Sequence, residues 1–452
     1  MPLSFIGPSY KLPSRALGVQ RTIGLIPFAL ESQNERTRWA FADFPGLLRA
    51  WTIGGGEVRG MWACYGRMFA VVGSSLYECL SNGTQTMIGS IGSSAGRVDM
   101  VNNTQALVIA DGAYIYAWPF AGGSVVAVTT GGPRVAFLNQ YLLTTDPDTE
   151  RFKWCNVGNE TIWDALDFAS AEGSPDNLVG LIADHLDLKL GGTTSFETWV
   201  NTGTDAVFER DGGRYWEHGL AAAHTLQKLA NTVLWLGSDE RGSLAVFTDA
   251  GGAPKRVSTG DLEQKLTGID VSQATAYTLT LGQFGLYCIN VPGLDTTHVY
   301  EVGSGQWFEL AELVNGDYTQ HRARCHVYAF GKHYVGDANG NICELRGDVY
   351  TNDGDVKLRD RICPNDATPT RALQRFGAFS IDCDRGYGGQ MLMRYSNDGG
   401  ATWGSWRYVS LGAVGVRNQK AQALMCGAAR DRVTQARVTD AVPWNPVQAV
   451  YA

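Results

Sequence analysis

The chain lacks the features that mark membrane, secreted and zinc-stabilised proteins. It has no run of about 18 apolar residues, so no membrane-spanning helix is predicted. The opening MPLSFIGPSYKLPSR does not combine a charged start with an apolar stretch, so we expect no secretory signal there. The nine cysteines are an odd number without a C-x-x-C pair, which argues against a zinc knuckle or a dithiol site. We expect a reducing compartment in which cysteines serve as small apolar side chains.

Basic charge and nucleotide-binding motifs are also scarce. The 37 Lys and Arg against 45 Asp and Glu give a net charge of −8, whereas proteins that grip DNA phosphates are usually basic. The chain contains no G-x-x-x-x-G-K-[ST] loop and no stripe of interleaved basic and aromatic residues. These absences argue against a DNA-clamping enzyme and predict no cofactor.

Helical periodicity is almost absent, and strand and turn signals dominate. Glycine (55 residues) and aromatic residues (11%) are frequent, which is typical of many short strands joined by tight turns. One short helix is expected at 261–266, after a cap at 258–260. Hairpins with Gly- or Asp-bearing turns are predicted at 69–79, 107–118 and 334–345. Similar hairpins without a strict period favour an all-β fold, an irregular β-propeller of six or seven blades.

The composition changes along the chain and suggests three stretches. Residues 1–44, with several prolines, are expected to form an extended N-terminal arm. Residues 45–365 would form the propeller. Residues 366–452 carry further strand signals at 375–383, 390–396, 404–411 and 431–439, which predict a C-terminal β-sandwich.

Residues 396–403 match the Asp-box pattern S-x-D-x-G-x-T-W. The defining residues are Ser396, Asp398, Gly400, Thr402 and Trp403. We expect Asp398 to accept bonds from backbone amides of the turn, Gly400 to take a positive φ, and Trp403 to pack behind the hairpin. Asp-boxes recur in sialidases, so an Asp-box propeller glycosidase is the enzymatic alternative. That enzyme needs several boxes and an early arginine before Ile-Pro, and the sequence offers one box without such an arginine motif.

Two further patterns suggest catalysis or metal binding but have simpler interpretations. Residues 92–96 fit G-x-S-x-G, yet the nucleophile elbow needs a helix after the serine, and the residues after Ser94 alternate as a strand. A Gly-Ser turn accounts for them. His321, His326 and His333 are the densest histidine group, but strand alternation would put His321 and His326 on opposite faces. Solvated or core histidines are therefore expected instead of metal ligands.

Basic residues gather modestly towards the C-terminus. Arg417, Lys420, Arg430 and Arg432 are candidate docking residues for an acidic partner. The alternative is a solvated face with internal ion pairs, as the order Arg430-Asp431-Arg432 suggests.

The segment 154–199 places aromatic-flanked strands around an acidic, turn-rich loop. Together with pieces elsewhere, it resembles the tail-nozzle proteins of short-tailed, podovirus-like bacteriophages, also called packaged-DNA stabilisation or head-completion proteins. The pieces that carry the resemblance are, in chain order, Gln20-Arg21, Pro45-Gly46-Leu47, Trp154, Trp163-Asp164, residues 168–172, Asp176-Asn177, Glu197, Trp199, residues 257–260, residues 394–400, Arg430-Asp431-Arg432 and residues 437–440. Their order is more specific than any one of them.

The resemblance implies a structural virion protein of the viral tail, assembled in the host cytoplasm and without an active site. Such a protein would form a homo-hexameric ring, a tail tube below the portal and its adaptor (head-to-tail connector) protein. It would close the head after packaging and let double-stranded DNA pass without specific binding during ejection. Its other partners would be a tail fibre or spike and a distal plug or needle protein. A receptor-binding tail protein is the non-enzymatic alternative.

Overall fold

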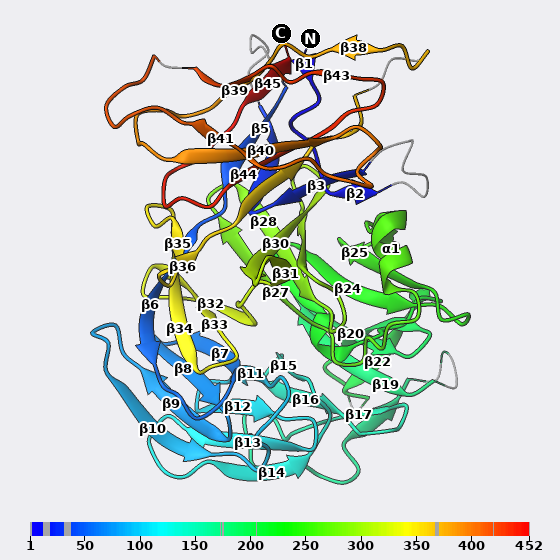
Figure 1. Ribbon diagram of the computed structural model, residues 1–452. Coiled ribbons are helices and arrows are strands. Elements are labelled where there is room, and N and C mark those ends of the chain that lie inside the picture. The colour runs from blue at the N-terminus through cyan, green and yellow to red at the C-terminus, as the bar shows by residue number, and fades with distance from the viewer. Residues whose placement is uncertain are drawn as a thin grey trace. The chain divides into compact units, whose positions relative to one another are not determined.

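The structure is a computed structural model that describes residues 2–11, 19–30, 38–171, 173, 176–204, 206–366, 370–418 and 420–451. Nearly every described element is a strand, which confirms the all-β class. The chain divides into two compact units (Figure 1). Unit 1 contains residues 1–48, 295–321 and 345–452, and unit 2 contains residues 49–294 and 322–344.

Unit 2 is an irregular β-propeller with seven blades. Five blades are complete four-stranded antiparallel sheets. The first blade consists of β7 (Val58–Cys64), β8 (Arg67–Val72), β9 (Ser75–Cys79) and β10 (Gln85–Ser90), and the second of β11 (Asp99–Asn102), β12 (Ala106–Ala110), β13 (Tyr114–Pro119) and β14 (Val126–Thr130). The third consists of β15 (Val135–Leu138), β16 (Tyr141–Thr145), β17 (Arg151–Trp154) and β18 (Phe168–Ser170), and the fourth of β19 (Leu178–Asp184), β20 (Asp187–Gly192), β21 (Phe196–Asn201) and β22 (Phe208–Trp216). The fifth consists of β23 (Gln227–Leu229), β24 (Thr232–Ser238), β25 (Leu244–Asp249) and β26 (Lys255–Arg256).

Of the last two blades, unit 2 contains only the inner strands. These are β27 (Thr275–Leu281) with β28 (Phe284–Asn290), and β32 (Cys325–Ala329) with β33 (Lys332–Gly336) and β34 (Asn341–Arg346). The first strand of each blade is the innermost, and neighbouring inner strands touch around the ring. The short helix η1 (Ala223–Thr225) contacts both β19 and β27, and β32 contacts β7. The ring of blades therefore closes, within the predicted range of six or seven.

The inner hairpins turn tightly at one end of the propeller. In the first and last blades the turns are Tyr65-Gly66 and Phe330-Gly331, with all four residues at φ values between 51° and 76°. Two consecutive residues in this region form the type I′ turn, whose twist matches the flanking strands. Tyr65 and Phe330 have a left-handed backbone conformation, which residues with large side chains seldom adopt.

Unit 1 contains two sheets that face each other across one apolar core. The first has the order β1 (Pro2–Leu3), β45 (Gln448–Tyr451), β39 (Ala378–Asp382) and β42 (Ala421–Leu424). The second runs β29 (Thr297–Glu301), β30 (Gln306–Val314), β3 (Val19–Ile23), β37 (Arg359–Ile362), β44 (Val433–Val438), β40 (Gln390–Ser396) and β41 (Arg407–Ser410). Phe379, Met391, Met393 and Trp444 are among the buried core residues. Figure 1 shows the blue N-terminal strands β1 and β3 among the orange and red C-terminal ones.

Shorter strands complete unit 1. Strand β2 (Tyr10–Lys11) pairs with β3, and β31 (Asp317–Gln320) pairs with β30. Strand β4 (Leu25–Ala29) pairs with β5 (Trp39–Asp43), and β38 (Gln374–Arg375) pairs with β43 (Ala428–Ala429). Strand β35 (Thr351–Asn352) pairs with β36 (Asp355–Val356) and with the start of β6 (Gly46–Thr52). The two units interleave along the chain, so the division into residues 1–44, 45–365 and 366–452 remains a proposal. Residues 12–18 and 31–37 of the predicted arm lie outside the described residues.

Several local predictions are confirmed. Helix α1 (Gly260–Leu266) begins after Thr259, whose hydroxyl accepts from the Leu262 amide. The three predicted hairpins are β8–β9, β12–β13 and β33–β34. All nine cysteines are free thiols and eight are buried, as expected of small apolar side chains. Within the described part of the chain, no helix has the length and apolar character needed to cross a membrane.

Candidate functional sites

The Asp-box is a closed hydrogen-bonded turn between β40 and β41. The Asp398 carboxylate accepts from the Ser396 hydroxyl at 2.6 Å, from the Thr402 amide at 2.9 Å and from the Thr402 hydroxyl at 2.6 Å. Ser396 in turn accepts from the Gly400 amide, and Gly400 has a φ of 87°. Bonds from Ser396 and Thr402 hold the pKa of Asp398 well below its usual range. All these contacts lie inside the turn, so the geometry is that of a structural motif.

Trp403 has a half-buried side chain, and the Arg394 guanidinium lies 4.8 Å from the centre of its ring. That the ring packs behind the hairpin remains a prediction. The ring is held on one side by a cation–π contact, a weaker interaction than complete burial.

That contact is the end of a longer row, which we call the arginine–aromatic ladder. Three arginines and three aromatic rings alternate, with guanidinium-to-ring distances between 4.3 and 5.5 Å. In order they are Arg21, Tyr318, Arg437, Trp406, Arg394 and Trp403. Two buried acids neutralise part of the row: Glu309 pairs with Arg21 at 2.6 Å, and Asp360 pairs with Arg437 at 2.6 Å. The ladder joins segments far apart in sequence, which explains why no basic–aromatic stripe is visible in the sequence.

Replacing Trp403 with alanine is expected to reduce the free energy of unfolding of unit 1 by about 1–2 kcal/mol, because a half-buried ring loses one cation–π contact and part of its apolar contacts. Chemical denaturation followed by tryptophan fluorescence would measure it. The control is Tyr408→Ala, since Tyr408 is 75% exposed on the neighbouring β41. A loss as large as that of a buried aromatic, about 3–5 kcal/mol, would contradict the ladder geometry.

Of the four candidate docking residues, three are exposed: Arg417, Lys420 and Arg430. Arg432 is a correction, because only 1% of it is exposed. Its guanidinium lies between the rings of Phe376 and Tyr395, at 4.1 and 4.2 Å from their centres, and donates to the Cys426 carbonyl. It fixes the core of unit 1 and presents no charge to a partner.

The Gln20-Arg21 pair anchors the N-terminal segment. Gln20 accepts a bond from Arg361, and Arg21 pairs with Glu309 and Asp295. Arg361 is fully buried, and its guanidinium donates to six oxygen atoms of the N-terminal segment: the carbonyls of Ser4, Phe5, Gly7 and Pro8, the Thr22 hydroxyl and the Gln20 side-chain carbonyl. Burial lowers the pKa of Arg361 to about 10. Sequence reasoning missed Arg361, which no local motif marks.

Asp176 has a comparable role in the propeller. Its buried carboxylate accepts from the amides of Thr193 and Thr194 at 2.8 Å and from the amide and hydroxyl of Ser195 at 2.9 Å. A Cβ on Gly192 would lie 2.3 Å from Asp176 Oδ2, so the turn after β20 needs glycine there. Within the 154–199 block, Asp176 thus fixes the turn between β20 and β21.

The G-x-S-x-G segment is a turn between β10 and β11, with strand and not helix after it, as predicted. Arg59, 1% exposed, holds it by donating to the carbonyls of Ser93, Ala95 and Gly96 and to the Ser93 hydroxyl. Ser94 itself is exposed. The geometry is that of a braced turn.

The histidines do not converge on a metal. His326 and His333 lie edge to edge, Nε2 to Nδ1 at 3.0 Å, whereas His321 lines a separate small cavity in unit 1. Burial, with a smaller effect of His333, lowers the pKa of His326 to about 3. Across the described residues, no three histidine, cysteine or acidic side chains are placed to share a metal ion.

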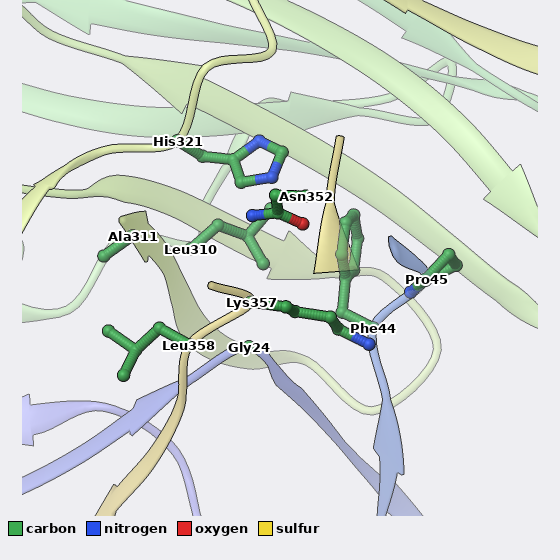
Figure 2. Close-up of a pocket in the computed structure, with 9 residues that line it drawn as sticks. All are labelled: Gly24, Phe44, Pro45, Leu310, Ala311, His321, Asn352, Lys357 and Leu358. Carbon is green, nitrogen blue, oxygen red and sulfur yellow. The ribbon is translucent and has the colours of Figure 1, made fainter. Parts of the chain in front are cut away.

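Figure 2 shows the cavity that His321 lines, with Phe44, Asn352 and Lys357 around it. Its volume is about 10 Å³, the least that a single water molecule needs. Lys357 pairs with Asp43 at 2.8 Å, and burial lowers its pKa to about 8. The cavity is too small for a substrate.

Comparison with known proteins gives a family for the chain. The family described as "Bacteriophage P22 Gp10, beta-propeller" matches residues 27–350, more than half of the sequence. None of the curated proteins matches this chain.

Solved structures to which the chain is similar include the Pan2 WD40 domain of Neurospora crassa, at 8% identity over 67% of this chain and 95% of that one, with a TM-score of 0.43. The WD40 propeller domain of Doa1 is 12% identical over 67% of this chain and 97% of that one, with a TM-score of 0.41.

Proposed function

Because the chain belongs to the bacteriophage P22 Gp10 β-propeller family, whose members are structural proteins of the phage tail, we propose that it is the tail nozzle of a short-tailed bacteriophage. It assembles as a ring of six copies below the portal and adaptor, closes the head after packaging, and conducts DNA during ejection. The single observation that carries this proposal is the family match over residues 27–350. Assembly takes place in the host cytoplasm, and the product stays in the virion tail.

The partners in this proposal are other virion proteins. The adaptor binds on the head side, and a tail fibre or spike and a distal plug or needle protein complete the tail. Arg417, Lys420 and Arg430, all exposed, are the proposed docking residues for an acidic partner surface. Arg432 is not among them, because it is buried.

We further propose that the role is non-catalytic. The bonds of Asp398 stay within its own turn, and Ser94 lies in a turn that leads into a strand. Turnover of sialosides or esters that disappears in Asp398→Ala or Ser94→Ala protein would favour the glycosidase or hydrolase alternative.

A reconstruction of the assembled tail is expected to show six copies around a channel whose wall is neutral or acidic. The chain carries a net charge of −8, and a basic wall would bind DNA phosphates with salt-dependent strength and slow ejection. A head-to-tail interface either closes into a ring or continues as a filament, and a tail tube requires the ring. Any other number of copies, or a wall lined with Arg and Lys, would refute the proposal.

A further inference from the structure

Unit 1 carries an exposed surface that combines apolar and basic side chains, which we call the basic–apolar patch. Residues 374–377 lie against residues 426–429, and the patch surrounds this contact. Its members are Arg371, Leu373, Arg375, Leu424, Met425 and Arg430. Met425 is 87% exposed. Arg430 donates to the Arg371 carbonyl at 3.0 Å, and this bond joins the two segments of the chain that form the patch.

The backbone of this patch is strained. Met425 and Arg371 have φ values of 56° and 49°, in the left-handed region that non-glycine residues seldom adopt. Such strain persists where the surrounding structure fixes it, often at functional surfaces. One acid, Asp431, lies 3.7 Å from Arg371 beside the patch, against three exposed arginines within it, so positive charge dominates.

Unit 2 carries a surface of opposite charge on the loop between β17 and β18, residues 155–167, which we call the acidic–apolar loop. Val157, Ile162 and Leu166 are exposed on it, Leu166 by 82%. Asp164 is exposed beside them. Burial and the nearby Asp164 raise the pKa of the Asp167 carboxyl, as expected for neighbouring like charges. Residues 155–167 contain no Lys or Arg, and the nearby Arg151 lies over the Phe168 ring.

The acidic–apolar loop is held in one conformation. The Trp163 indole donates to the Glu160 carbonyl at 2.9 Å, and the Glu160 carboxylate accepts from Asn103 at 2.9 Å. The Gly158 amide donates to the Gln140 carbonyl of the adjacent hairpin turn. A loop held this firmly with its apolar side chains outward loses little conformational entropy when a partner covers it, and exposed apolar clusters mark interaction sites.

We propose that the basic–apolar patch of one copy docks onto the acidic–apolar loop of the next copy, and that this contact closes the ring. The inference rests on the proposed ring-forming function and names its interface. Each copy has one surface of each sign, so the contact is head-to-tail, the kind that produces closed rings. Apolar side chains supply contact area at the centre, and opposite charges at the edge select the partner.

The test uses two variants that each remove one surface. Met425→Asp places a charge in the basic–apolar patch, and Leu166→Asp places one in the acidic–apolar loop. Both side chains are highly exposed, so the fold is expected to remain, as circular dichroism would check. Met87→Asp is the matched control, because Met87 is also exposed but lies on β10, outside both surfaces.

Mass photometry of the full chain is expected to give rings of six copies for the wild type and the control, and monomers for each variant alone. A mixture of the two variants is expected to give dimers and nothing larger, because each pair retains one intact contact. Rings from either variant alone, or a mixture that stays monomeric, would overturn the proposed interface; in the second case the surfaces face another virion protein. A wild type that stays monomeric would instead overturn the ring itself.

Discussion

Arg361→Met is expected to lower the free energy of unfolding of unit 1 by about 3–5 kcal/mol and to expose the N-terminal segment to protease. The substitution removes the donor for four backbone carbonyls between Ser4 and Pro8, for Thr22 and for Gln20. A buried acceptor that loses its partner costs about 1–3 kcal/mol, and several buried acceptors share the Arg361 guanidinium as their donor. Chemical denaturation and limited proteolysis followed by mass spectrometry would measure the two effects.

The control for Arg361 is Arg417→Met, which removes an exposed guanidinium from the same unit and is expected to change stability by less than about 0.5 kcal/mol. Arg361→Lys is expected to fall between, because an ammonium keeps the charge but cannot reach the same fork of acceptors. Equal stability of Arg361→Met and the control would contradict the anchoring role.

Asp176→Ala is expected to destabilise the propeller by about 3–5 kcal/mol, because it leaves the amides of residues 193–195 without the carboxylate that accepts from all three. Hydrogen exchange of these three amides would localise the effect. Glu209→Ala on β22 of the same blade is the control, since Glu209 is exposed.

The same site gives a pH dependence. Burial alone would raise the pKa of Asp176, but the bonds from Thr193, Thr194 and Ser195 outweigh it and lower the pKa. Its stabilisation is therefore full above the unfolded value of about 3.9 and is lost as the pH falls through the folded value. The difference between wild type and Asp176→Ala should be constant near neutral pH and shrink in acid. A difference that grows in acid would refute this assignment.

Features encoded by neighbouring residues could be predicted from the sequence. The alternation of apolar residues and the Gly-bearing turns indicated the hairpins at 69–79 and 107–118, and the Thr259 cap indicated α1. Their number and similarity indicated a propeller. The Asp-box turn at 396–402 also follows from local spacing, because its bonds join residues two to four positions apart.

Features that depend on distant segments could not be predicted. Nothing near Arg432 in the sequence indicates that Phe376 and Tyr395 cover its guanidinium, so it was assigned to the surface. The half-buried position of Trp403 depends on Arg394, which lies across the hairpin on β40. The arginine–aromatic ladder joins residues 21, 318, 394 and 437, and Arg361 binds carbonyls more than 330 positions earlier. Burial of a charged side chain is decided by such contacts and not by its neighbours in sequence.

The pairing of β3 with β37 also determines how late in synthesis β3 can complete its sheet. At about 5–20 residues per second, the ribosome needs on the order of half a minute to travel from Thr22 to Arg361, which are partners in the antiparallel pair β3–β37. Until then β3 has an open edge, whereas the first five propeller blades pair only with strands made within seconds of one another. β3 therefore waits for its long-range partner while the propeller forms, and β1 waits longest, until β45 emerges. That interval is when chaperones and other nascent chains compete for these N-terminal strands.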